Sequence, residues 1–205
     1  MTGERKMIEQ KTNPIGIFDS GVGGLTVARA VVARLPNENI VYFGDTAHFP
    51  YGDKSETALC NYAANITEFL LAKKVKLILI ACHTASSVAF EAVKKIAAGK
   101  ALVLNVIDPT VELLKQKHAA VRKIGIIATK QTIGSGVYQK RIAAALPQAV
   151  IAAHATPILA PAIEEGFADN SAIDHILKVY LNHHDLVNID ALVLACTHYP
   201  LIKDK

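Results

Sequence analysis

Two stretches of this 205-residue chain decide its fold, VKLILIACHTA at 75–85 and IDALVLACTHY at 189–199. Each begins with an apolar run that is typical of a buried parallel strand. Ala, Cys and a pair drawn from His and Thr then follow. In parallel α/β sheets, functional groups gather outside the carboxyl ends of the strands, which is where Cys82 and Cys196 stand. The repeat predicts two similar halves that place two thiols across one cleft. The simpler alternative is two unrelated buried cysteines.

Strand-like and helix-like segments alternate along the rest of the chain. Near-continuous apolar runs predict strands at Ile15–Phe18, Ile40–Phe43, Lys76–Ala81, Ala101–Val106, Lys123–Ala128, Ala149–Ala153 and Asp190–Ala195. Amphipathic stretches predict helices at Leu25–Leu35, Ser55–Lys73, Thr84–Ala97, Pro109–Gln116, Thr132–Ala145 and Ser171–Asn182. This alternation predicts an α/β fold made of two similar domains, each with a mostly parallel sheet flanked by helices.

A proline that follows an apolar strand, Pro109, marks the expected break between the two halves. We expect residues 1–13 to form a disordered tail, 14–107 the first α/β domain and 108–205 the second. The first domain would carry Cys82, and the second would carry Cys196. The active site is expected in the cleft between them.

Composition excludes several classes of protein. Hydrophobic residues make up 51% of the chain and charged residues 20%, which is the balance of a globular protein and not of a disordered one. The longest unbroken apolar runs are about six residues, whereas a membrane helix needs roughly 20. The net charge of +4 is scattered, so we expect no direct nucleic-acid binding. Three cysteines cannot all pair, and the polar N-terminus is no secretory signal, so free thiols in the cytoplasm are expected.

Two loops follow the first two predicted strands. FDSGVGGLT at 18–26 is glycine-rich and opens a helix, whose N-terminus favours anions, although the simpler alternative is a turn in which Asp19 caps that helix. GDTAHFPYG at 44–52 is longer than a typical strand-to-helix loop. Long loops at this edge of a sheet often bind ligands, but a structural loop is equally compatible with the sequence.

The clearest indication of a chemical function comes from two short motifs, Cys82-His83-Thr84 and Cys196-Thr197-His198. A thiol acts as a base or nucleophile only as a thiolate, and its pKa can fall near a helix N-terminus or a histidine. A Cys–His nucleophile is therefore one interpretation. A zinc site is another, but adjacent Cys82 and His83 side chains cannot easily point at one ion. Cys60 lies within a helical stretch, and we expect it to be packed and inert.

Five motifs in order resemble the glutamate racemase family, and the resemblance runs from Ile15 to Ile202. The motifs are FDSGVGGLT, YFGDTAHFPYGDKS, ACHTAS, the Ala128-Thr129 turn with Thr132-Ile133, Ser135-Gly136 and Tyr138, and ACTHYPLI. The resemblance implies a two-domain enzyme that inverts the α-carbon of glutamate without pyridoxal phosphate or metal. It also implies a bacterial cytoplasmic protein that supplies D-glutamate for peptidoglycan, and hence for cell-wall biogenesis and cell shape. A homodimer is compatible with it.

The resemblance further implies roles for individual residues. Cys82 and Cys196 would be the acid and base on opposite faces of the substrate. Matched positions imply that Asp19 assists Cys82 and that Glu164 and His198 assist Cys196. The substrate would be held by Ser20, Pro50, Tyr51, Gly52, His83, Thr84, Thr129, Thr132 and Thr197.

The chain departs from the family in two places. The family usually has Asn at the position of His83, which is larger and can carry a charge, so this position bears on substrate preference. Family members also continue past the motif at 195–202 with elements that return to the first domain, so we expect a C-terminally truncated chain. Two other functions stay open: racemisation of aspartate or another small amino acid, and a binding or regulatory role for an inactive homologue.

Overall fold

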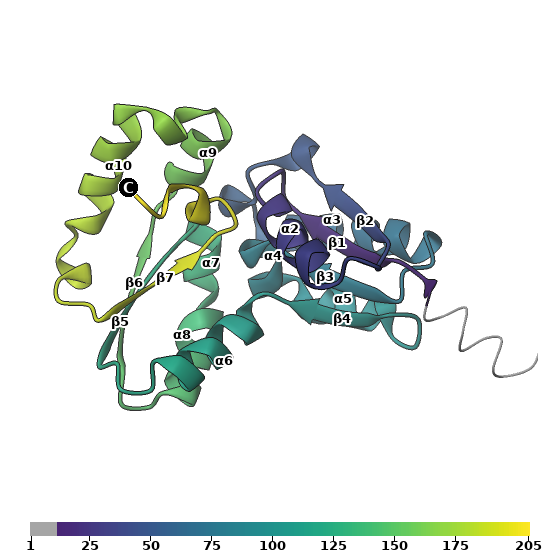
Figure 1. The fold of residues 1–205 in the computed structure, drawn as a ribbon, viewed down its shortest axis with the longest axis horizontal. Coiled ribbons are helices and arrows are strands. Elements are labelled where there is room, and N and C mark those ends of the chain that lie inside the picture. Colours follow the sequence, from purple (N-terminus) through teal and green to yellow (C-terminus); the bar gives the residue numbers. More distant parts are fainter. Residues whose placement is uncertain (1–11) are drawn as a thin grey trace, which may run out of the picture.

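Two parallel sheets lie side by side in the computed structural model, which describes residues 12–205 (Figure 1). The first sheet has the strand order β2-β1-β3-β4, with β1 at Ile15–Asp19, β2 at Ile40–Gly44, β3 at Leu77–Ile80 and β4 at Leu102–Asn105. The second has the order β6-β5-β7, with β5 at Lys123–Ala128, β6 at Val150–Ala155 and β7 at Ala191–Ala195. Every pairing is parallel. The predicted fold class is confirmed, and the predicted tail at 1–13 lies almost entirely outside the described residues.

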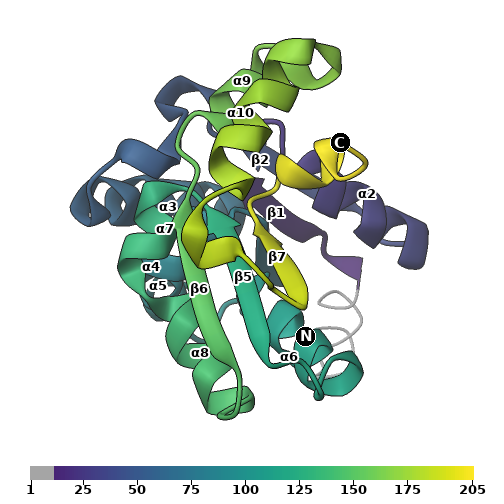
Figure 2. The same cartoon turned by 90° about the vertical axis from the view of Figure 1, so that its left-hand side faces the viewer.

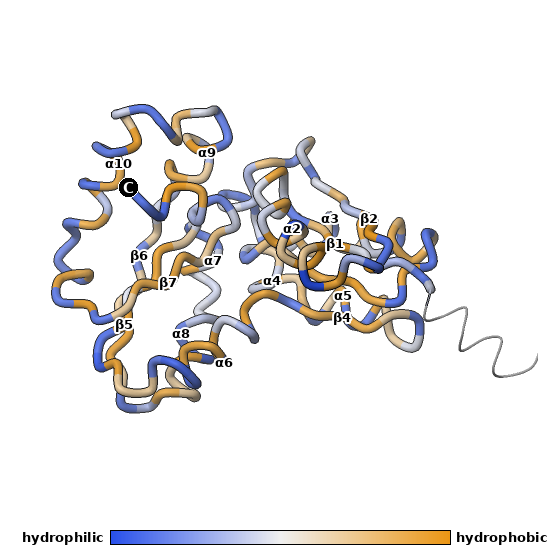
Figure 3. The backbone as a smooth tube through the Cα atoms, in the orientation of Figure 1, coloured by the Kyte–Doolittle hydropathy of each residue, from blue (hydrophilic) through white to orange (hydrophobic). Residues whose placement is uncertain are grey.

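Two strands that have a neighbour on each side, β1 and β5, are the most buried. All five residues of β1 are buried, and β1 is flanked by β2 and β3. In the second sheet β5 lies between β6 and β7, and five of its six residues are buried. Figure 3 shows apolar residues along the strands of both sheets. Strands covered on both faces need apolar side chains at successive positions, and this is the pattern that made them visible in the sequence.

Helices cover the sheets and return the chain to the start of each next strand (Figures 1 and 2). Around the first sheet lie α2 at Leu25–Arg34, α3 at Glu56–Ala72, α4 at His83–Val88 and α5 at Phe90–Ala97. The helix α6 at Ile107–Lys117 connects the two sheets. Around the second sheet lie α7 at Lys130–Ser135, α8 at Val137–Ala145, α9 at Leu159–Glu164 and α10 at Ser171–Leu181. No helix in residues 12–205 is long and apolar enough to cross a membrane.

Three helical segments differ from the sequence prediction. The predicted helix at Thr84–Ala97 is divided into α4 and α5 at Ala89, and the predicted helix at Thr132–Ala145 is divided into α7 and α8. The second division falls at Gly136, whose φ of 67° is left-handed and ends α7. The helix α9 was missed because Pro161 favoured a turn, but this proline lies in the first helical turn, where no backbone N–H is needed.

The chain changes sheet across α6. Asn105, the last residue of β4, accepts hydrogen bonds from the backbone N–H groups of Ile107 (2.8 Å) and Asp108 (2.9 Å) and so caps α6. Pro109 lies in the first turn of this helix, where it is well tolerated. The predicted division between residues 107 and 108 lies within this helix and stays a prediction.

Substitution of Ile78 tests which residues hold the first sheet. Ile78 is fully buried in β3, so Ile78→Ala should lower the free energy of unfolding by about 2–5 kcal/mol. Leu102 in β4 is 59% exposed, and Leu102→Ala serves as the matched control, with an expected loss below about 1 kcal/mol. Urea unfolding followed by circular dichroism measures both. Equal losses for the two variants would contradict the assignment of the core.

Candidate active site

The carboxyl ends of four strands bring the predicted site residues together. In the first sheet, β1 ends at Asp19 and β3 is followed by Ala81 and Cys82. In the second, β5 leads directly to Thr129, and β7 leads directly to Cys196. Cys82 is the residue that precedes α4, and Thr129 precedes α7. The local sequence therefore places each of these side chains at the junction of a strand and a turn or helix.

A small cavity lies where these strand ends meet. Its volume is about 20 Å³, which is room for about one water molecule. Eleven of the fourteen predicted site residues line it: Ser20, Pro50, Tyr51, Gly52, Cys82, His83, Thr84, Thr129, Cys196, Thr197 and His198. Both thiols therefore face one enclosed space and reach it from different sheets.

The three remaining predicted residues lie behind the lining and contact it. Asp19 accepts a hydrogen bond from the Thr197 hydroxyl (3.3 Å). Glu164 is hydrogen-bonded to the His198 ring, and Thr132 to the Thr84 hydroxyl (3.1 Å).

Two residues of the lining were missed by the sequence analysis, Phe49 and Ala160. The ring of Phe49 lies 5.6 Å from that of His198, between centroids. The signal for Phe49 was its place in the long loop before Pro50. Nothing in the sequence indicated Ala160, because the helix that contains it, α9, was not predicted.

Burial dominates the chemistry of Cys82. Its thiol is 4% exposed, and its sulfur accepts a hydrogen bond from the backbone N–H of Ala85 (3.4 Å). Burial and then the nearby Asp19 carboxylate raise the pKa of Cys82 to about 12, against the smaller opposing effect of hydrogen bonds from Ala85 and Ser20. In the substrate-free protein this cysteine is a thiol.

Cys196 is paired with a histidine that is itself held by a carboxylate. Its sulfur lies 3.7 Å from Nδ1 of His198, and Nε2 of the same ring forms a hydrogen bond with Glu164. Burial raises the pKa of Cys196 strongly, and Cys82 and Asp19 add to the rise. A nearby helix N-terminus or histidine can lower a thiol pKa, but here the pKa values of Cys82 and Cys196 are both raised. The reason is that desolvation of the thiolate outweighs both effects.

The Asp19 side chain reaches from the end of β1 to the start of α2. The sequence indicated this helix N-terminus as a place where an anion could bind. The Asp19 carboxylate accepts hydrogen bonds from the backbone N–H groups of Gly21 (3.1 Å) and Gly24 (3.0 Å). The carboxyl group is fully buried, and burial raises its pKa. The anion at this helix terminus is therefore a side chain of the protein itself.

Three threonine hydroxyls join the two halves. Thr84, from α4, lies 2.9 Å from Thr129 and 3.1 Å from Thr132, and the latter two are 2.9 Å apart, oxygen to oxygen. Each hydroxyl can donate one proton and accept two, so the triangle is self-satisfied. A bound carboxylate could accept the protons that these hydroxyls now share among themselves.

Glycine allows the loops of one half to approach the other. A Cβ atom on Gly23 would lie 2.6 Å from Cε1 of His198, and one on Gly52 would lie 2.7 Å from Cβ of Thr129. Both distances are far below van der Waals contact. The glycine-rich turn of 18–26 and the loop of 44–52 can therefore close over the second half only without side chains at these positions.

His83 connects the halves through a partner that the sequence did not indicate. Its Nδ1 lies 2.7 Å from the hydroxyl of Tyr138, which is fully buried in α8. Burial lowers the pKa of His83 to about 4, so the ring is neutral at pH 7. The departure from asparagine at this position therefore changes size and hydrogen bonding but adds no charge.

Buried Asp45 holds the loop of 44–52 in shape. Its carboxylate accepts a hydrogen bond from the Tyr51 hydroxyl (2.6 Å) and lies 2.8 Å from Nδ1 of His48. His48 stacks on Tyr62 of α3, with centroids 4.0 Å apart. This network fixes Tyr51, one of the residues that line the cavity.

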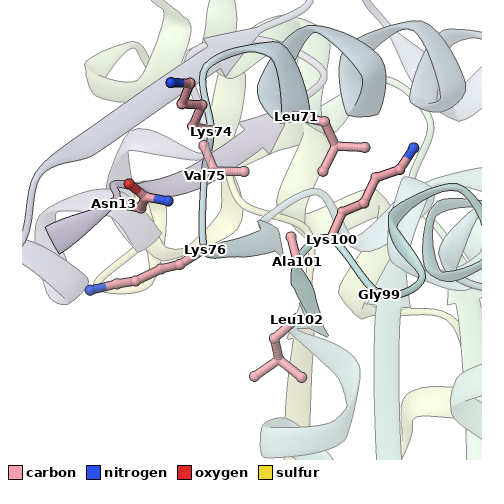
Figure 4. A pocket seen from close by; sticks show the side chains of 9 residues that line it. All are labelled: Asn13, Leu71, Lys74, Val75, Lys76, Gly99, Lys100, Ala101 and Leu102. Atoms are coloured by element: carbon pink, nitrogen blue, oxygen red, sulfur yellow. The ribbon is translucent and has the colours of Figure 1, made fainter. Parts of the chain in front are cut away.

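A larger cavity lies elsewhere and lacks the features of a catalytic site. It has a volume of about 560 Å³ and is found at the opposite end of the first sheet, around Lys74, Lys76 and Lys100. Figure 4 shows the three lysine side chains pointing in different directions. They do not converge on one point. The small cavity between the sheets, which both Cys82 and Cys196 line, is therefore the candidate active site.

The raised thiol pKa can be tested by alkylation at different pH values. Near pH 8, a pKa of about 12 leaves roughly one Cys82 in 10,000 as thiolate. The iodoacetamide reaction rate of Cys82 should therefore rise about tenfold per pH unit up to about pH 10, while that of N-acetylcysteine levels off. Peptide mass spectrometry gives the rate for each cysteine. A Cys82 rate that levels off below about pH 9 would contradict the raised pKa.

Comparison with known proteins shows the family to which this chain belongs. Residues 24–205 match the model of the Asp/Glu/Hydantoin racemase family. A glutamate racemase of Syntrophus aciditrophicus is 45% identical over 191 residues, which cover 93% of this chain and 70% of that protein. A glutamate racemase of Neisseria meningitidis is 43% identical over 195 residues, covering 94% and 71%.

A solved structure agrees with the sequence relatives. The crystal structure of glutamate racemase from Francisella tularensis in complex with D-glutamate superposes with a TM-score of 0.86 at 40% identity. The match covers 94% of this chain and 72% of that one. The chain therefore belongs to the Asp/Glu/Hydantoin racemase family of isomerases.

Proposed function

We propose that this chain interconverts L- and D-glutamate by proton transfer between the α-carbon and two cysteine thiols. The observation that carries the proposal is that Cys82 and Cys196 line one enclosed cavity and reach it from different sheets. The names of the relatives and the D-glutamate in the Francisella tularensis structure support glutamate as the substrate. No cofactor or metal enters the proposed reaction.

The reaction needs one base and one acid. The thiolate of one cysteine takes the α-proton and becomes a thiol, while the electron pair of the broken C–H bond spreads onto the α-carboxylate. The thiol of the other cysteine then gives its proton to the opposite face of the carbon and becomes a thiolate. The configuration is inverted, and the reverse reaction exchanges the two roles.

Each thiol has neighbours that can help it lose its proton. For Cys196 the proposed acceptor is Nδ1 of His198, 3.7 Å from the sulfur, with Glu164 stabilising the imidazolium from the other side of the ring. For Cys82 the contacts are the N–H of Ala85 and Ser20, both of which favour the thiolate. Asp19 opposes this thiolate in the free protein. We propose that the substrate ammonium, placed near Asp19, offsets that repulsion and lowers the thiol pKa values.

Hydroxyl and backbone groups would hold the two carboxylates of glutamate. We propose that Thr84, Thr129 and Thr132 give up their mutual hydrogen bonds to one carboxylate. The remaining contacts would come from the other lining residues proposed to bind substrate, namely Ser20, Pro50, Tyr51, Gly52, His83 and Thr197. Donors of this kind also stabilise the charge that develops on the α-carboxylate in the transition state.

The cavity must widen before glutamate can enter, because its volume of about 20 Å³ is far too small for an amino acid. The contacts between halves, such as Thr84 with Thr129 and Asp19 with Thr197, would then break and re-form around the substrate. Closure expels water, which strengthens the electrostatic interactions on which the proton transfer depends. We further propose that the product supplies peptidoglycan synthesis in the bacterial cytoplasm, and that the chain binds no nucleic acid and can form a homodimer.

Substitution of each cysteine tests the assignment. Cys82→Ala and Cys196→Ala should each lower the rate of L-glutamate racemisation by at least about 1,000-fold, because removal of either thiol leaves one face of the carbon without a proton carrier. Cys60 is half-buried in α3 and lies outside the cavity, so Cys60→Ala is the matched control and should keep normal turnover. Circular dichroism of the substrate follows the rate, with L-aspartate measured in parallel. Normal turnover in either active-site variant would refute the two-thiol assignment, and faster turnover of aspartate would refute the substrate.

A further inference from the structure

A group of metal-ligand side chains lies in the second half, apart from the residues that line the active-site cavity. The chain leaves α10 at Leu181 and passes through His183, His184 and Asp185 before it enters β7. In Figure 1 this turn lies on the side of the second sheet that faces away from the first sheet. Among residues 12–205 it is the one group of three such side chains whose ligand atoms all lie within 4.8 Å of one another.

The carboxylate lies between the two imidazole rings. One oxygen of Asp185 is 3.3 Å from Nδ1 of His183, and the other is 3.2 Å from Nε2 of His184. Nδ1 of His183 also accepts a long hydrogen bond from the backbone N–H of Asp185 (3.4 Å), which a bound ion would replace. Zinc binds imidazole nitrogen and carboxylate oxygen at about 2.0–2.2 Å, so two ligands of a tetrahedral ion lie roughly 3.4 Å apart. The spacing in the turn is close to this value.

Side chains of adjacent residues ordinarily point in different directions, but the rings of His183 and His184 lie close together. His183 has an extended backbone (φ −63°, ψ 136°), and His184 begins the 3-10 turn η4 at His184–Leu186. The two ring centroids are consequently only 4.3 Å apart, with an angle of 35° between the planes. The backbone of the turn thus presents two imidazoles to one point.

Packing fixes the turn before any ligand arrives. Leu186 is buried in the core of the second half and anchors η4. The His183 ring stacks on His154 of the edge strand β6, with centroids 4.1 Å apart and an angle of 28°. The outer side of the group is open, because the His184 side chain is 83% exposed and that of Asp185 49%. Water can therefore complete a coordination shell.

We propose that His183, His184 and Asp185 form a binding site for one divalent metal ion of the zinc, cobalt and nickel class. Two imidazoles and one carboxylate suit these ions, whereas magnesium and calcium prefer oxygen ligands. The ion would stabilise the turn between α10 and β7, and His154 would hold the His183 ring from behind. The site is separate from the two thiols, so racemisation does not depend on it.

Zinc titration of an untagged, metal-stripped chain tests this site. Isothermal calorimetry should show one ion bound at micromolar concentration, and the double variant His184→Ala, Asp185→Asn should bind it at least tenfold more weakly. The matched control is His175→Ala in α10, an exposed histidine whose Nδ1 is 2.9 Å from the Ser171 carbonyl oxygen, and it should bind zinc as the unchanged chain does.

Cobalt distinguishes this site from the active-site cysteines. Co²⁺ bound by imidazole and carboxylate should give visible ligand-field bands without the near-ultraviolet charge-transfer band of a thiolate ligand. The double variant should lose these bands and keep the racemisation rate of the unchanged chain. The proposal is overturned if the double variant binds zinc as tightly as the unchanged chain, if cobalt shows thiolate ligation only, or if no ion binds below roughly 100 μM. In those cases the three side chains are ordinary surface ion pairs.

Discussion

Desolvation of two cysteine thiols is the constraint on which the rest of the site depends. Cys82 and Cys196 share an enclosed space of about 20 Å³, and burial is the largest cause of the raised pKa of each. A buried thiolate is a strong base because little solvent stabilises it, and strong bases are what removal of a weakly acidic α-proton requires. The same burial makes the thiolate hard to form. The groups around each sulfur therefore determine under which conditions its thiolate can form.

The two thiols are embedded in different surroundings. Cys196 has a histidine–carboxylate pair within reach, so its proton has a defined acceptor in His198. Cys82 has a buried carboxylate, Asp19, and backbone donors but no histidine acceptor of its own, because the His83 ring is directed to Tyr138. The two halves are therefore similar in fold and different in how they would handle a proton.

Much of this arrangement could be predicted from the sequence, because parallel strands buried on both faces are nearly continuous in apolar residues. The repeat of 75–85 and 189–199 placed both thiols at strand ends, and the fold class followed from the alternation of strands and helices. The Gly136 break and α9 were missed, because a left-handed glycine and a proline in a first helical turn depend on backbone geometry that periodicity does not express.

The pKa values of the two thiols also could not be predicted from the sequence. A neighbouring histidine can lower a thiol pKa, but the sign of the shift depends on burial, which the sequence does not give. The pairing of His83 with Tyr138 likewise needed the two halves to be placed together, since the residues are far apart in the chain.

The distribution of deuterium in the first turnovers tests the account of two opposed thiols most directly. L-Glutamate would be incubated with the chain in deuterated water, and both enantiomers would be separated and analysed by mass spectrometry before equilibrium. Two separate proton carriers predict that the new D-glutamate carries deuterium at the α-carbon while the remaining L-glutamate carries almost none. Deuterium appearing in the recovered L-glutamate as fast as racemisation proceeds would show a single proton carrier, and would contradict the account.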